Sequence, residues 1–413
     1  MLTGSSFQLL FGKFYTFWSI KWVFISTIGI FELGSLICAV TPNSVTLIIG
    51  RAVAGMGSAG IFAGALTILA YTVPLEKRPV YSGMIGSMWG TLSVAGPLLG
   101  GVFTEKLSWR WCFYINLPVG FVTVGVITFF SPEPERRKIP MTWKQQVWQM
   151  DPMGTVALLP AIVCLLCWRC IGEDPSILGI WRMQDNATVP PRILKKRTVW
   201  ASSLFEFFIG ACFLLAVYFL PIWFQAVKGA SAVKSGVMNI PMLLSVVIFS
   251  VTSGAAVTSW GYYTPFIIGG AVLMPIGYGL MSTLAADSFA AAWIGYQVIA
   301  GAGVGMGMQQ PLMASLGGAL FVSAGQTVFT NRLEEYVREF APQVDPRAVL
   351  AAGATGIRSV FAEKVLDGIV RSFNSALTNC FWVSTATAAA AITGAVFVEW
   401  KSVKGKNVDM ATA

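Results

Sequence analysis

The sequence has no histidine, and only 11% of its 413 residues are charged. A soluble globular protein carries roughly a quarter charged residues, so this chain falls far short of a soluble surface. At the same time 55% of its residues are hydrophobic, and the mean hydropathy is +0.68. A soluble core could not bury so much apolar surface, and the composition therefore indicates a membrane protein.

Cysteine is also scarce and is not spaced as a disulfide framework, since the seven cysteines lie mostly inside apolar runs. Cys164, Cys167 and Cys170 form a CxxCxxC string with hydrophobic flanks. Without histidine nearby, small packing residues explain this string better than a metal or cluster site. We therefore expect no metal and no cofactor, and the lack of a plausible nucleophile and base pair argues against an enzyme.

Apolar residues occur in runs of about twenty, the length that a helix needs to cross a bilayer. Because backbone groups must be paired internally in lipid, and alternation typical of barrel strands is absent, the runs predict helices. The fold class is predicted as all-α, a polytopic transmembrane bundle with about ten to eleven recognisable spans. The predicted spans are residues 22–41, 46–72, 81–103, 114–131, 153–170, 200–225, 236–258, 263–284, a double-length run at 291–328, and 375–398.

The net charge of +9 comes from short basic clusters between apolar runs. No basic face forms, so orientation signals fit better than nucleic-acid binding. Lys13 with Lys21, Lys77 with Arg78, and the cluster at 136–144 fall on alternate connectors, which places these connectors in the cytoplasm. Met1 leads into apolar residues without a charged leader or a cleavage site, so no cleavable signal peptide is expected.

Two longer polar stretches organise the chain. Residues 171–199 end in a basic trio and predict a cytoplasmic linker between an N-terminal helix bundle at 1–170 and a C-terminal bundle at 200–413. Residues 327–373 form a polar loop with mixed charge and helical periodicity around 349–370.

The segment from Gly50 to Gly60 contains a GxGxxG match. A dinucleotide-binding fingerprint would follow a strand, whereas these glycines lie within one apolar run. Closely spaced glycines let a neighbouring membrane helix approach, so helix packing is predicted for four of them. These are Gly50, Gly55, Gly57 and Gly60.

Three ionisable residues lie within apolar runs, where a charge is costly and is usually kept for function. For Arg51 this cost favours a functional role, with snorkelling to the membrane surface as the alternative. Glu32 and Glu206 could each carry a proton, and plain hydrogen bonding between helices is equally open for both.

A glycine and proline cluster in the run at 81–103 predicts a hinge or a tight helix crossing. It comprises Gly96, Pro97, Gly100 and Gly101. Polar and aromatic residues of the later runs could line a substrate path, although membrane-surface belts use the same residue types. The candidates are Tyr218, Trp223, Gln225, Tyr296, Gln309 and Gln310.

Together these motifs resemble the major facilitator superfamily, and within it the fungal drug:proton antiporters with fourteen spans. Gly50 to Gly60 resembles the fourth-span motif of that family, whose arginine is associated with proton coupling. Ala95-Gly96-Pro97 with Gly100-Gly101 resembles the fifth-span antiporter motif, and Trp109 to Pro118 is similar to the segment that enters the sixth span. The resemblance implies multidrug or mycotoxin efflux.

Such a protein would be a multi-pass plasma-membrane pump, expected as a monomer, that exports a lipophilic drug, toxin or secondary metabolite against inward protons. Its partners would be the substrate, protons and the lipid bilayer. Two alternatives stay open. The same fold could take up a nutrient or an iron chelate, or a shortened, non-transporting paralogue could act as a receptor or regulator.

The chain departs from the family pattern at several points. By comparison with the family, we expect that the first span is missing, that the second is cut short at Met1, and that residues 171–183 are too polar for the eighth span. Near Ala314 and Ser315 the chain skips a loop and part of a helix, so that two spans are fused at 291–328. This run could still form a hairpin turning near Gln309 to Pro311, because it is nearly twice one span in length. We interpret the chain as a shortened gene model or a defective paralogue.

Overall fold

The computed structural model describes residues 2–74, 77–78, 80–85, 88, 96, 99–100, 102–103, 106–130, 196–307 and 311–400. Within these residues nearly all secondary structure is α-helical and no β-strand occurs. The described residues fall into two compact units, one drawn from 1–78 and 103–200 and the other from 79–102 and 201–402. The all-α prediction is confirmed.

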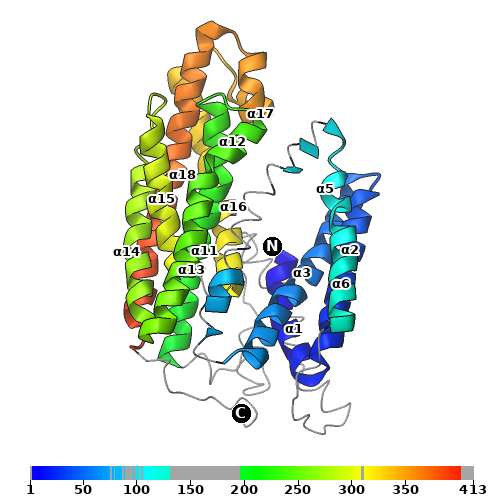
Figure 1. Ribbon diagram of the computed structural model, residues 1–413. Helices are drawn as coiled ribbons and strands as arrows, with labels where there is room; N and C mark the ends of the chain where they lie inside the picture. The colour runs from blue at the N-terminus through cyan, green and yellow to red at the C-terminus, as the bar shows by residue number, and fades with distance from the viewer. Residues whose placement is uncertain are drawn as a thin grey trace, which may run out of the picture. The chain divides into compact units, whose positions relative to one another are not determined.

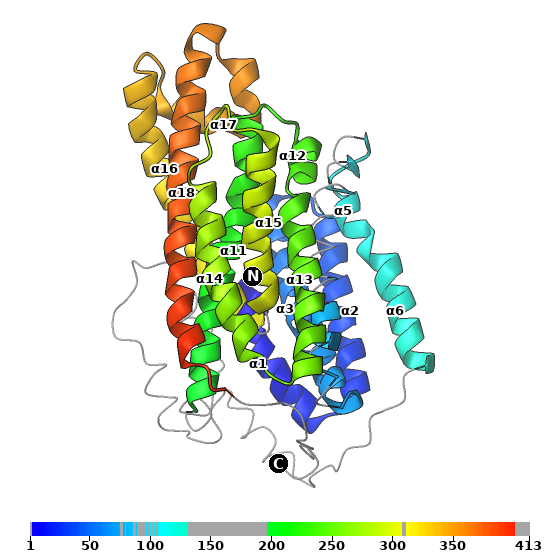
Figure 2. The ribbon, with the colours of Figure 1, turned by 60° about the vertical axis from the view of Figure 1, so that its left-hand side comes forward.

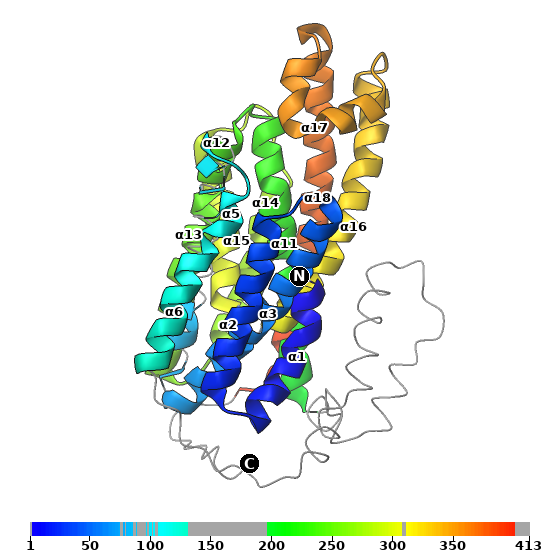
Figure 3. The same cartoon turned by 90° about the vertical axis from the view of Figure 1, so that its right-hand side faces the viewer.

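The first unit contains five described helices, and three of them lie side by side in Figure 3: α1 (Leu2–Phe17), α2 (Ile20–Ala39) and α3 (Ser44–Thr72). The short α5 (Trp111–Tyr114) and α6 (Asn116–Phe130) pack against α2. Asn43 caps α3, since its side-chain oxygen accepts a hydrogen bond of 2.9 Å from the Thr46 backbone N–H. A small core between these helices includes Phe11, Tyr15 and Ile20.

The second unit is a helical bundle (Figures 1 and 2). Its helices are α11 (Arg197–Ala226), α12 (Ala232–Met238), α13 (Ile240–Trp260), α14 (Thr264–Met281), α15 (Ala290–Gly307), α16 (Pro311–Phe340), α17 (Pro346–Val360) and α18 (Glu363–Phe397). Neighbouring helices pack in the order α13, α15, α14, α18 and α16. Phe213, Phe219 and Trp223 of α11 lie in the core of this unit.

Seven described helical segments are long and apolar enough to cross a membrane. They are Ile20–Ala39, Ser44–Thr72, Trp111–Phe130, Arg197–Ala226, Val233–Trp260, Thr264–Met281 and Glu363–Phe397. Each coincides with a predicted span, because an apolar run of this length is itself the physical requirement for crossing. The predicted span 153–170 lies outside the described residues, as do Cys164, Cys167 and Cys170, and 81–103 is described only in part.

The double-length run at 291–328 is divided between α15 and α16, with residues 308–310 between them, as the hairpin prediction requires. Gly307 is the last described residue of α15. It lies beside Phe205 and Ile209 of α11, well inside that helix, and α13 continues for ten residues beyond Ser250, which lies beside Gly305.

The polar stretch 327–373 is helical rather than open loop. It comprises the second half of α16, all of α17 and the first turns of α18, drawn in gold and orange at the top of Figure 1. Gly353 breaks α17 with a φ of 64° and a ψ of 172°, a conformation that side chains rarely adopt. The Arg358 guanidinium then donates a hydrogen bond of 3.2 Å to the Val227 carbonyl, just beyond the end of α11. This bond satisfies one of the carbonyls that a helix end leaves unpaired.

Candidate functional site

The glycines of α3 lie where neighbouring helices come closest. A Cβ atom at Gly57 would be 2.7 Å from the Phe31 Cα, and one at Gly50 would be 2.7 Å from the Cys38 Sγ. Both neighbours belong to α2. Helices approach this closely only where a side chain is missing, so these glycines set the α2–α3 packing distance.

The other two glycines of this motif face different neighbours. A Cβ at Gly60 would lie 2.8 Å from the Thr27 Cβ of α2, and one at Gly55 would meet the Thr3 hydroxyl of α1. The structure therefore places all four predicted packing glycines at helix contacts within the first unit.

Arg51 lies eight residues after the N-cap of α3, and its side chain is exposed. The centre of its guanidinium is 6.0 Å from the centroid of the Phe113 ring in α5, at the outer limit of a cation–π contact. Among the residues that the structure describes, no carboxylate forms an ion pair with Arg51. An exposed guanidinium close to a helix start fits the snorkelling alternative as well as a coupling role.

Glu32 points from α2 towards α6. A Cβ added at Gly120 of α6 would collide with the Glu32 carboxylate, so the acid occupies the space that this glycine leaves open. Its Oε2 atom is buried and has no hydrogen-bond partner among the described residues. One turn further along α2, Asn116 Nδ2 donates a hydrogen bond of 3.1 Å to Ser35 Oγ. The contact between α2 and α6 therefore contains polar side chains, although both helices are mostly apolar.

Glu206, the third intramembrane candidate, lies in α11, and only 1% of its surface is exposed. The adjacent Phe205 packs against Gly307 and Gly394, at the ends of α15 and α18. Glu32 belongs to the first compact unit, and Glu206 belongs to the second.

The predicted hinge is described only in part. Gly96 and Gly100 are helical, while Pro97 and Gly101 lie outside the described residues. A Cβ at Gly96 would meet no described atom within 4 Å, whereas one at Gly83 would lie 2.7 Å from the Ser250 carbonyl oxygen of α13. The close helix crossing that the structure shows in this segment is therefore at Gly83, which the sequence analysis did not select.

Two of the substrate candidates are engaged in helix packing. Trp223 is fully buried, and its Nε1 donates a hydrogen bond of 2.8 Å to Asn374 Oδ1 of α18. Gln225 Nε2 donates one of 2.9 Å to Ser235 Oγ of α12. Both lie in the last turns of α11, where they tie this helix to its neighbours.

The remaining substrate candidates are spread out. Tyr218 is 48% exposed, and Tyr296 is half-buried in α15. Gln309 and Gln310 lie outside the described residues. Neither Tyr218 nor Tyr296 lines either of the two hollows described below.

A buried polar cluster escaped the sequence analysis. Gln297 of α15 is fully buried and donates a hydrogen bond of 3.1 Å from Nε2 to the Met238 carbonyl, while Ser245 Oγ donates one of 2.7 Å to the Val298 carbonyl. Within the described residues, Gln297 Oε1 and Asn239 Oδ1 are buried without a partner. The only signal in the sequence was a lone glutamine in an apolar run.

The apolar helices, the glycine-based packing and the ionisable groups within spans define an integral membrane helix bundle. The sequence model of the Major Facilitator Superfamily matches residues 1–331, and the chain belongs to that superfamily. It is accordingly a membrane transporter and not an enzyme.

Relatives share much of the sequence. The chain is 48% identical to the MFS-type efflux pump MFS1 of Arthroderma benhamiae over 456 positions, which cover 100% of this chain and 85% of the relative. It is 43% identical to the efflux pump roqT of Penicillium rubens, covering 98% and 83%, and 43% identical to the aspyridones efflux protein of Neocamarosporium betae, covering 100% and 81%. Because the first alignment is longer than the 413 residues of the chain, that relative carries internal segments that this chain lacks.

Solved structures agree on the fold. The proton:xylose symporter XylE, of the same superfamily, superposes with a TM-score of 0.57 at 14% identity, covering 98% of this chain and 85% of that one. A bacterial homologue of the human lysosomal transporter Spinster superposes with a TM-score of 0.54 at 14% identity, covering 96% and 91%. At this identity the similarity establishes the fold alone.

Proposed function

We propose that the protein is a proton-coupled efflux transporter that moves a small lipophilic compound by alternating access at the plasma membrane. The observation that carries the proposal is the 48% identity, over the whole chain, to a relative named as an efflux pump. Other relatives above 40% identity have names of the same kind. The bundles predicted at 1–170 and 200–413, joined by the linker 171–199, would be the moving bodies of a monomeric transporter, with residues 79–102 packed in the second compact unit.

Proton coupling needs a group in the membrane that can gain and lose a proton. Glu32 suits this role, since its buried Oε2 has no hydrogen-bond partner among the described residues and a carboxylate so placed gains from protonation. Glu206 supplies a second buried carboxyl group in α11. Arg51, a permanent cation near the start of α3, would bias the protonation of acids that approach it during the cycle.

Conformational change would use the glycine-containing segment that includes Gly96, Pro97, Gly100 and Gly101. A membrane helix with glycines and a proline bends at a small cost in free energy. Groups on neighbouring helices can form hydrogen bonds with the backbone groups that the bend leaves unpaired. Gly83, which crosses α13 closely, would be the fixed point about which this segment moves.

Accumulation in cells tests the direction of transport. Cells that express the protein should retain less of a lipophilic fluorescent dye such as a rhodamine than cells that express the Glu32→Gln variant at equal membrane abundance. A protonophore should remove the difference. Higher dye retention in the expressing cells would instead establish uptake, the alternative left open by the fold.

One observation favours a second candidate, a ligand-binding paralogue that does not transport. The chain lacks internal segments that its relative at 48% identity carries, so its bundle would be shorter than that of a protein named as an efflux pump. Such a protein would bind the dye, and its unfolding temperature would rise, while the dye would not cross the membrane in either direction.

A further inference from the structure

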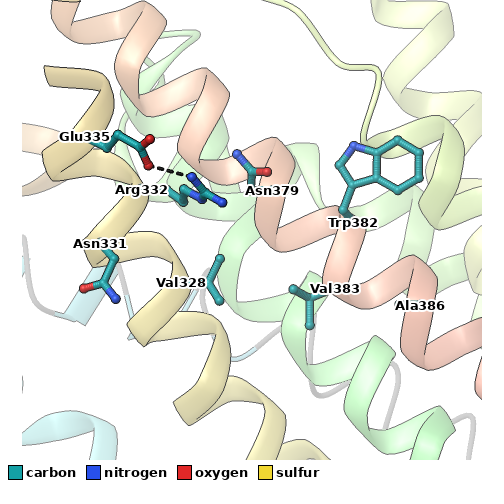
Figure 4. A pocket seen from close by; sticks show the side chains of 8 residues that line it. All are labelled: Val328, Asn331, Arg332, Glu335, Asn379, Trp382, Val383 and Ala386. Carbon is teal, nitrogen blue, oxygen red and sulfur yellow. Dashed lines mark hydrogen bonds and ion pairs between the residues drawn. The ribbon is translucent and has the colours of Figure 1, made fainter. Parts of the chain in front are cut away.

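A groove of about 600 Å³ opens between α16 and α18 (Figure 4). Four of its lining residues are apolar and aromatic: Val328, Trp382, Val383 and Ala386. The other four are polar or charged: Asn331, Arg332, Glu335 and Asn379. All eight belong to the second unit, and none of them was singled out by the sequence analysis.

The groove lies where both helices change from apolar to charged sequence. Residues 311–330 of α16 contain no charged side chain, and five charged residues follow between 332 and 339. In α18 the charges end at Arg371, and residues 372–397 contain none. Since apolar helix prefers lipid and charged helix prefers water, the groove lies at the membrane surface, where the headgroups of lipids are found.

Its charges are arranged along the membrane normal. Arg332 Nη1 lies 2.6 Å from Glu335 Oε2, and the two side chains are 49% and 59% exposed. Because the apolar half of α16 precedes them, Arg332 lies closer to the hydrocarbon than Glu335, by about 4.5 Å for three helical residues. The positive charge is therefore on the lipid side of the groove, and the negative charge is on the water side.

A second hollow continues outward from Asn331 and is richer in acid. It is lined by Glu334, Glu335, Glu339 and a single arginine, Arg338. This outer part would attract a cation and repel an anion. Trp382, which is 58% exposed, offers an aromatic surface of the kind that lies at headgroup level.

From this geometry we infer that the groove is a binding site for a zwitterionic glycerophospholipid, with a phosphocholine or phosphoethanolamine headgroup. The phosphate lies against Arg332, and the ammonium group reaches Glu335 and the acids beyond it. In such a headgroup the phosphate is nearer the acyl chains than the amine, which is the order of charges on α16. The first part of an acyl chain packs on Val328, Val383 and Ala386. Phosphatidylglycerol, an anionic lipid, lacks the amine, so nothing in its headgroup pairs with the acids.

Charge exchange tests the inference without breaking the ion pair. The double variant Arg332→Glu with Glu335→Arg keeps an oppositely charged pair three residues apart but reverses its direction. The matched control, Asp367→Arg with Arg371→Asp, exchanges another exposed pair, 3.0 Å apart on α18 and outside the groove. Both variants and the parent chain would be purified whole, and their folding would be compared by thermal unfolding.

Native mass spectrometry would then measure the retention of phosphatidylcholine and of phosphatidylglycerol with identical acyl chains. We expect the parent chain and the control to retain phosphatidylcholine preferentially, and the reversed pair to retain about tenfold less, as for the loss of one charge-assisted hydrogen bond. Equal retention by the reversed pair, equal retention of both lipids by the parent chain, or an equal loss in the control would each overturn the assignment. Transport activity does not enter this measurement, so its result is independent of the proposed efflux.

Discussion

At the scale of single residues, the protein places one carboxyl group where lipid-facing helices usually have none. Glu32 fills the gap opposite Gly120, and its Oε2 is buried without a hydrogen-bond partner in the described part of the chain. If it is the coupling group, Glu32→Gln will lower proton-driven flux by about tenfold or more, because an amide cannot take up or release a proton.

The control for this prediction is Glu363→Gln. It makes the same carboxylate-to-amide change at an exposed acid at the start of α18. Flux should be measured with and without a pH gradient at matched protein amounts. A Glu32→Gln protein whose flux still responds fully to the gradient would remove Glu32 from the coupling mechanism.

Gly57 gives a second prediction at this scale. A larger side chain there must push against the backbone of Phe31 in α2, and overpacking of this kind costs about 1–3 kcal/mol or more. Gly57→Val should therefore lower the thermal unfolding temperature in detergent. Gly29→Ala in α2, where no described atom lies within 4 Å of the new Cβ, should leave the temperature unchanged or raise it slightly.

At the scale of elements, α17 is stabilised as a cap over the end of α11. Val349 and Ile357 are fully buried, and Arg358 bonds to the Val227 carbonyl. The kink at Gly353 is what allows both halves of α17 to make these contacts.

Substitution at this kink separates backbone strain from steric fit. Gly353→Ala meets no described neighbour but must adopt a φ of 64°, so it should cost about 1–3 kcal/mol. Gly356→Ala, three residues on, has only an ordinary contact of 3.7 Å to the Ala352 Cβ and should be neutral or slightly stabilising. Thermal unfolding of the two proteins would check this, and equal stabilities would show that α17 contributes little to the fold.

The elements also show what a sequence can and cannot predict. Spans such as 46–72 and 263–284 were predicted because length and apolarity are the physical conditions for crossing a membrane. The division of the run 291–328 into two helices was predicted from its length, which is nearly twice that of one span. The kink at Gly353, the crossing at Gly83 and the buried Gln297 depend on which helix lies opposite, and a single sequence does not specify partners.

Some site residues could likewise be predicted from the sequence, and others could not. The α3 glycines could be selected in advance because small residues at close spacing have few other uses in a membrane helix. Trp223 and Gln225 were selected for their polar tips, yet their hydrogen bonds to Asn374 and Ser235 serve packing. The groove between α16 and α18 was not predicted, because its residues come from helices about fifty positions apart and form no linear motif.

At the scale of the whole molecule, two features have to be reconciled. The chain shares the superfamily fold and 48% identity with a relative named as an efflux pump, but it lacks internal segments of that relative and its α15–α16 connection is short. Transport by alternating access requires each half of the molecule to open and close the route to one membrane surface. Whether the shortened bundle still does so is the central question for its function.

Flux in reconstituted vesicles answers this question most directly. The purified chain would be placed in liposomes with an imposed pH gradient, and the movement of a lipophilic fluorescent dye would be followed against protein-free liposomes and the Glu32→Gln variant. Our account predicts dye movement against the direction of proton flow that a protonophore collapses, that protein-free liposomes lack, and that the Glu32→Gln variant shows at a rate about tenfold or more lower. Dye movement equal to that of the protein-free liposomes, from protein that is folded and still binds the dye, would contradict it.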